Sequence, residues 1–267
     1  MAISNLIVIG QYIPGDTFIH RMDSRIKLFI AMIMLVFIFM VGTLEALLIM
    51  FGLVLLVSFV AKVPFVHLLR GLRPILFLIV LTVLIQLFVT QGEPLIEFWG
   101  LSITKEGLIY SGKIILRLIT LVSVSIILTF ATSPLELTFA LESFMKPFKV
   151  IGFPASEVAL MMSIALRFIP TLLSEADKIV KAQSSRGADF TSGGLIARAK
   201  AFVPVLIPLF VSAFRRAEEL AQAMESRCFV TGGKRGRLHI AKIRPTDWLA
   251  LTTTLVCLVA LYWYASI

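Results

Sequence analysis

Long stretches without charged side chains constrain this chain more than any other feature. Residues 74–92 and 248–267 contain no Asp, Glu, Lys or Arg. An α-helix needs about 20 apolar residues to cross the hydrocarbon core of a bilayer, and both stretches have about that length. Three further apolar segments cover residues 28–44, 46–61 and 107–131. The sequence therefore predicts an all-α, polytopic membrane protein with about five transmembrane helices.

The composition agrees with a chain that has lipid as its main solvent. Hydrophobic residues make up 58% of the sequence and charged residues 15%, and the mean hydropathy is +0.96. These values lie outside the range of soluble globular domains. The net charge of +9 does not require nucleic acid as a partner, because Lys and Arg collect on the cytoplasmic side of membrane proteins.

The distribution of basic residues predicts the orientation in the cell membrane. Arg21, Arg25 and Lys27 precede the first apolar segment, whereas the opposite ends of the segments are rich in glutamate. Residues 132–247 hold 16 of the 25 basic residues. Since cytoplasmic loops carry the excess of Lys and Arg, the N-terminus is expected in the cytoplasm and the C-terminus outside.

The basic middle region is expected to be helical. Ser133 and Glu136 form a capping-box pattern that starts a short helix, which should end near Pro147. A second helix should run from about 154–157 to Arg186, where Gly187 offers a left-handed cap, and a third from about 195 to Arg227. Pro204 and Pro208 are expected to kink the third helix.

These helices could lie at the membrane surface or cross it. Arg167 interrupts the apolar residues 158–173, and the uncharged stretch 201–214 is short for a span. We therefore favour amphipathic helices at the cytoplasmic face over a further spanning pair. The expected domains are an N-terminal membrane domain (1–131), a cytoplasmic coupling domain (132–244) and a C-terminal transmembrane helix (245–267).

The ends of the second and third helices resemble each other at an offset of 41 residues. Four positions of the first helix are identical in the second: Ala176, Ala182, Ser185 and Arg186 match Ala217, Ala223, Ser226 and Arg227. A guanidinium at a helix end offers a fork of donors to a carboxylate on a partner. Two such ends suggest two similar partners, although solvated helix-terminal cations or lipid-headgroup contacts would give the same pattern.

Motifs for catalysis are missing from the sequence. His20, His67 and His239 accompany no HExxH pattern, and no phosphate-binding loop or nucleophile elbow occurs. Cys228 and Cys257 lack the spacing of a thiolate metal site. The sequence thus predicts a non-catalytic subunit without cofactor or metal.

Lys113 and Arg117 share one face of the span 107–131. A substrate or counter-ion role is possible for them, but we favour a Lys113 that reaches the outer interface and an Arg117 that is bonded inside the bundle.

Several segments together identify a family. Over nearly its whole length, the sequence resembles the transmembrane T component of energy-coupling factor (ECF) transporters for vitamins and metals. The matching segments are residues 20–28 (HRMDSRIKL), 167–172 (RFIPTL), 175–177 (EAD), 182–187 (AQSSRG), 216–221 (RAEELA) and 224–227 (MESR).

The resemblance implies a function and a set of partners. In that family, Ala-Arg-Gly motifs end two coupling helices and dock into acidic grooves of two ABC-type ATPase subunits. The corresponding residues here are Ser185, Arg186 and Gly187, and Ser226, Arg227 and Cys228. Cys228 replaces the second glycine, which argues against a left-handed cap there. The resemblance also implies a substrate-binding S component in the membrane, to which the T component transmits ATPase motion.

Two other functions remain open from the sequence. A stand-alone secondary transporter would need ionisable residues and broken helices at the membrane midplane, which these spans largely lack. An assembly scaffold without transport would use docking arginines equally well. The transported vitamin or metal would be selected by the partner, so the sequence does not identify it.

Overall fold

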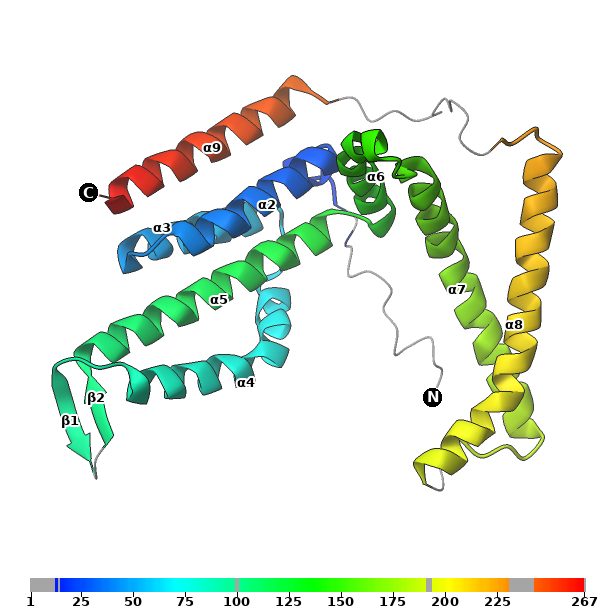
Figure 1. Cartoon of the computed structure of the whole chain (residues 1–267), viewed down its shortest axis with the longest axis horizontal. Helices are drawn as coiled ribbons and strands as arrows, with labels where there is room; N and C mark the ends of the chain where they lie inside the picture. The colour runs from blue at the N-terminus through cyan, green and yellow to red at the C-terminus, as the bar shows by residue number, and fades with distance from the viewer. Residues whose placement is uncertain (1–12, 14, 99–100, 191–193, 231–242, 267) are drawn as a thin grey trace. The chain divides into compact units, whose positions relative to one another are not determined.

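The computed structural model describes residues 13, 15–98, 101–190, 194–230 and 243–266 (Figure 1). These residues divide into two compact units. The membrane unit comprises the described residues of 11–140 and 239–267, and the second unit those of 141–238. Helices dominate both units, which confirms the all-α prediction. A short antiparallel hairpin of β1 (Pro94–Phe98) and β2 (Leu101–Thr104) was not predicted.

Five helices of the membrane unit overlap the five predicted apolar segments. They are α2 (Ser24–Met40), α3 (Leu44–Val60), α4 (Phe65–Val89), α5 (Lys105–Ala131) and α9 (Pro245–Ser266). The short α1 (Phe18–Arg21) precedes them. Helix α5 packs against α2, α3 and α4, and α9 lies along α2 and α3 (Figure 1).

The membrane unit has an apolar interior and an apolar exterior. Ile38, Leu47, Met50 and Leu258 are fully buried between α2, α3 and α9. On the outside, Phe59 keeps 85% of its surface exposed. An apolar surface on both sides of a helix is what a lipid-exposed bundle requires, since only its inner face contacts protein.

A close approach and a proline shape α4. A Cβ atom on Gly71 would clash with Cδ1 of Ile126, so any larger residue would require the Ile126 side chain to move at this contact between α4 and α5. Figure 1 shows α4 sharply bent, and Pro74 lies inside the helix. Proline removes one helical hydrogen bond and clashes with the preceding turn, which accounts for the bend.

Two cations are bonded inside the membrane unit. Lys27, with 6% of its surface exposed, donates from Nζ to the carbonyls of His20 and Ala131 at 2.9 Å each. Arg117 donates from Nη2 to the carbonyl of Val41 at 2.8 Å. The interpretation of Arg117 as bonded within the bundle is confirmed. Lys113 lies 5.3 Å from the ring centre of Tyr110, a cation–π contact.

The middle region forms the helices that the sequence predicts. Helix α6 (Pro134–Met145) starts with a capping box, in which Ser133 and Glu136 each accept the other's backbone N–H at 3.3 Å. A 3₁₀ turn, η2 (Lys146–Ile151), leads to α7 (Ala155–Ser185) and then to α8 (Leu195–Glu225).

Helix α8 contains two prolines, and α7 is long enough to cross a membrane. Helix α8 continues through Pro204 and Pro208, and Figure 1 shows it bent in the N-terminal half that contains both. By length and composition, α4, α5, α7 and α9 could all cross a membrane, so α7 meets this criterion although the sequence favours a surface location for it.

Candidate functional site

The end of α7 carries the left-handed cap that its sequence predicts. Gly187 has a φ of +88°. Its N–H donates to Ser184 O at 3.0 Å, and the N–H of Ala188 donates to Gln183 O at 3.0 Å. This pair of bonds defines a Schellman motif, which satisfies the last helical carbonyls. The exposed Arg186 directly precedes the cap.

The end of α8 repeats this geometry with a cysteine in place of the glycine. Cys228 has a φ of +57°, and its N–H donates to Glu225 O at 2.8 Å. The N–H of Phe229 donates to Met224 O at 3.0 Å. The sequence-based argument against a left-handed cap at Cys228 is therefore wrong.

The hydrogen bonds explain why a residue other than glycine is tolerated. A left-handed residue with a Cβ atom costs roughly 1–2 kcal/mol. Two backbone hydrogen bonds offset this cost at Cys228. Met224 and Phe229, both half-buried, also occupy the two positions whose apolar side chains commonly meet in this motif.

Both arginines are available to a partner. Arg186 and Arg227 are exposed, and neither has an ion-pair partner among the residues that the structure describes. The serines beside them point back to their own helices: Ser185 donates to Lys181 O at 3.1 Å and Ser226 to Ala223 O at 3.0 Å. Each helix end thus presents a small side chain and one free guanidinium.

A polar contact joins the two helices where they pack. Glu175 of α7 accepts hydrogen bonds from Ser212 at 2.5 Å and from Arg216 at 2.7 Å, both on α8. Ser212 is buried. The hydrogen bond from Ser212 and the positive charge of Arg216 lower the pKa of the Glu175 carboxyl, so the contact contains a carboxylate at neutral pH.

This contact has a simple relation to the sequence repeat. Glu175 and Arg216 are themselves 41 residues apart, and they therefore occupy equivalent positions of the two similar helices. The sequence comparison looked for identical residues at the offset of 41, and Glu175 and Arg216 differ. A search for opposite charges at equivalent positions would have found this contact. Arg186 follows Glu175 by eleven residues, and Arg227 follows Arg216 by the same number.

The helix segments from Glu175 to Arg186 and from Arg216 to Arg227 have the same length, so α7 and α8 are related by an approximate two-fold axis at their contact. Eleven residues of helix rise about 16 Å, and α7 and α8 run in opposite directions (Figure 1). The two arginines therefore lie at opposite ends of the hairpin, roughly 30 Å apart along it. Such a spacing suits two separate binding sites better than one.

The outer surface of α8 is apolar over several turns. Ile207, Phe210, Val211 and Phe214 each expose at least 60% of their surface. A patch of this kind marks a contact with lipid or with another protein. Within the described part of the chain, no group of three or more His, Cys, Asp and Glu side chains could hold a metal ion.

Comparisons with known proteins give one consistent result. The family model described as "Cobalt transport protein" (CbiQ) matches residues 15–240. The EcfT transmembrane protein of the energy-coupling factor transporter from Clostridium kluyveri is 46% identical over 252 residues, which cover 94% of this chain and 93% of that protein. EcfT from Ruminiclostridium cellulolyticum is 49% identical, with 92% of each chain covered, and EcfT from Brevibacillus brevis is 42% identical, with 97% and 98% covered. The chain therefore belongs to the CbiQ/EcfT family, the transmembrane T components of energy-coupling factor transporters.

Proposed function

We propose that this chain couples ATP hydrolysis by two ABC-type ATPase subunits to the motion of a substrate-binding S component, for the uptake of a vitamin or metal ion. The chain itself is non-catalytic. The observation that supports this role most directly is the pair of exposed arginines, each placed at a Schellman-capped helix end at the same distance from the α7–α8 contact.

Arg186 and Arg227 are the proposed anchors, each in an acidic groove of one ATPase. A free guanidinium can form a bidentate pair with a carboxylate, which fixes direction as well as distance. Ser185 and Ser226 are small enough for the helix tip to enter a groove. Gly187 and Cys228 turn the chain away after the tip, so that the following residues do not block it.

The α7–α8 contact suits the transmission of force. Glu175 binds two side chains of α8, so a displacement at one helix end moves the other helix as well. The apolar face of α8 around Phe210 and Phe214 is then the proposed surface for the S component. In this arrangement the coupling domain, residues 132–244, lies at the cytoplasmic face of the cell membrane, the N-terminus is cytoplasmic, and the C-terminus, after the last transmembrane helix (245–267), is outside.

The decisive experiment reverses the charge of both arginines. The tagged chain is co-expressed with candidate ATPases and S components, purified in detergent, and assayed for association and for ATP-dependent uptake in vesicles. The Arg186→Glu, Arg227→Glu double variant should insert in the membrane but lose the ATPases. Lys200→Glu, an exposed cation elsewhere on α8, should keep them.

Three outcomes separate the alternatives. Unchanged ATPase binding in the double variant contradicts the docking role. Uptake by the purified chain alone would favour a secondary transporter. An intact complex that hydrolyses ATP but never moves substrate would favour an assembly scaffold.

A further inference from the structure

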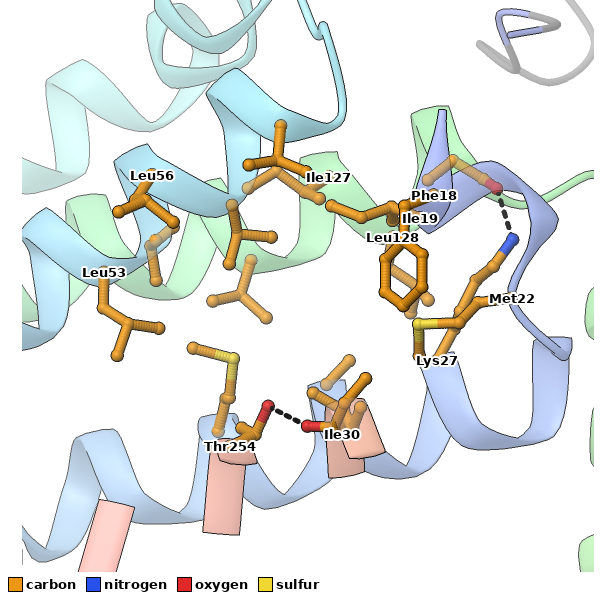
Figure 2. A pocket seen from close by; sticks show the side chains of 18 of the residues that line it. Phe18, Ile19, Met22, Lys27, Ile30, Leu53, Leu56, Ile127, Leu128 and Thr254 are labelled. Atoms are coloured by element: carbon orange, nitrogen blue, oxygen red, sulfur yellow. Dashed lines mark hydrogen bonds between the residues drawn. The ribbon is translucent and has the colours of Figure 1, made fainter. Parts of the chain in front are cut away.

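The membrane unit contains an apolar cavity that the proposed coupling role does not use. It has a volume of about 330 Å³ and lies between α2, α3, α5 and α9 (Figure 2). Its inner wall is formed by buried side chains such as Met34, Val54 and Ile127. The space is therefore enclosed by apolar groups on the side that faces the bundle.

The other side of the apolar cavity is open. Leu56 on α3 and Leu249 on α9 border it and expose 63% and 68% of their surfaces. Both helices coincide with predicted membrane spans, so this rim faces hydrocarbon rather than water. An apolar chain in the bilayer can therefore enter from the side.

One end of the apolar cavity contains a charged side chain, that of Lys27. Figure 2 shows Lys27, Phe18 and Met22 at one end and Leu53 and Leu56 at the other. Next to the Lys27 end lies a second space, the polar hollow, of about 430 Å³, which shares the walls Phe18 and Val60 with the apolar cavity.

Lys62 gives the polar hollow a free positive charge. Asp16 and Arg21 pair with each other at 3.5 Å, whereas Lys62 is exposed and has no ion-pair partner in the described ranges. Lys62 also has a φ of +54°, and the N–H of Lys62 donates to Phe59 O at 3.0 Å while that of Val63 donates to Ser58 O at 3.1 Å.

The backbone at Lys62 favours glycine, so the presence of a lysine there suggests a role for its side chain. A left-handed conformation is strained for residues with a Cβ atom, and glycine would end α3 with the same two bonds. A lysine at such a position supplies something that the cap does not need, namely an ammonium group at the polar hollow.

We propose that the two adjoining spaces form a binding site for an anionic glycerophospholipid. One acyl chain occupies the apolar cavity, and the phosphate lies at the Lys62 ammonium in the polar hollow. An amphiphile fits because the two spaces adjoin and differ in polarity in the order that a lipid presents, tail then phosphate. The bound lipid would fill the gap between α9 and the other helices and so fix α9 to the bundle.

The test uses the full-length chain in nanodiscs, with phosphatidylglycerol that carries a photoreactive diazirine on one acyl chain. Irradiation should label the peptides that contain Met34 and Leu53. Unlabelled phosphatidylglycerol should compete roughly fivefold better than phosphatidylcholine, the preference expected from one lysine. Absence of labelling at these peptides, or equal competition by both lipids, overturns the proposal.

Two variants separate the tail site from the phosphate site. Ala250→Phe places a ring in the apolar cavity and should reduce labelling severalfold, whereas Ala260→Phe, on the same helix outside the cavity, should not. Lys62→Gly suits the backbone and should fold at least as well, but it should abolish the preference for phosphatidylglycerol. Full labelling in Ala250→Phe, or an unchanged preference in Lys62→Gly, contradicts the assignment. Neither result depends on ATPase docking.

Discussion

At the scale of single residues, the two helix ends differ in whether the capping residue has a Cβ atom, which decides the strain of its left-handed conformation. Gly187 adopts its left-handed conformation without strain, and Cys228 adopts the same conformation at a cost. The hydrogen bonds around both residues are alike, so the position of Arg227 relative to its helix matches that of Arg186.

This comparison predicts opposite effects of two substitutions. Cys228→Gly should stabilise the end of α8 by about 1 kcal/mol, because it removes the left-handed strain, and Gly187→Ala should destabilise the end of α7 by a similar amount. Hydrogen exchange of the last turn of each helix measures both effects. ATPase association should persist in Cys228→Gly. Faster exchange in Cys228→Gly would show that the cysteine side chain contributes more than its strain costs.

At the scale of helices, the contact between α7 and α8 depends on one carboxylate. Glu175 holds Ser212 and Arg216 together, and it sits at the position equivalent to Arg216 in the repeat. Two helices with the same charge at this position would repel each other. The two helices therefore keep the same spacing, but at the position where they touch α7 has a negative side chain and α8 a positive one.

A charge swap tests this arrangement. Glu175→Arg and Arg216→Glu should each increase hydrogen exchange in the middle of α7 and α8, and the double variant should restore much of the protection, with a coupling of about 1 kcal/mol. Lys178→Gln, a nearby exposed position, serves as the control.

The pH dependence of the same contact has a defined sign. The pKa of Glu175 is lowered from its ordinary value of 4.5 in the folded hairpin. The contact is therefore at full strength above that value and weakens as the pH falls below it, so the protection of the α7 and α8 amides, relative to their intrinsic exchange at each pH, should fall on acidification. In the charge-swap experiment, equal hydrogen exchange in Glu175→Arg, in Arg216→Glu and in the wild type would show that apolar contacts alone hold α7 and α8 together.

At the scale of the whole molecule, α7 and α8 can either lie at the cytoplasmic face or cross the bilayer as a pair. Helix α7 is long and apolar enough to cross a bilayer, yet its C-terminal half exposes Lys178, Lys181 and Arg186. A crossing by α7 and α8 would leave both chain termini where the charge distribution predicts them, but it would move Arg186 to the outside. The positions of the termini therefore do not distinguish the two arrangements.

A cysteine at the end of α7 distinguishes them. Ser185→Cys, combined with Cys228→Ser and Cys257→Ser, should react with a membrane-impermeant maleimide in inside-out vesicles and stay unlabelled in right-side-out vesicles. This result follows if Arg186 lies in the cytoplasm beside the ATPases. Labelling in right-side-out vesicles only would place α7 across the membrane and exclude Arg186 as a cytoplasmic anchor.

The sequence by itself determined the helices, the membrane class and the family. Uncharged runs such as 74–92 leave a helix in lipid as the stable state, because unpaired backbone groups are too costly there. The capping box at Ser133 and the cap at Gly187 are local, so the residues alone predicted them.

Only the tertiary structure decided what depends on distant partners. The left-handed Cys228 is different, because its two backbone hydrogen bonds lie within the end of α8, and only the balance of strain against these local bonds escaped the sequence. The Glu175–Arg216 contact, the apolar cavity and the polar hollow at Lys62 arise where separate segments meet. Local energies fix each helix, whereas the contacts that give Arg186 and Arg227 their opposed positions exist only after the helices have packed.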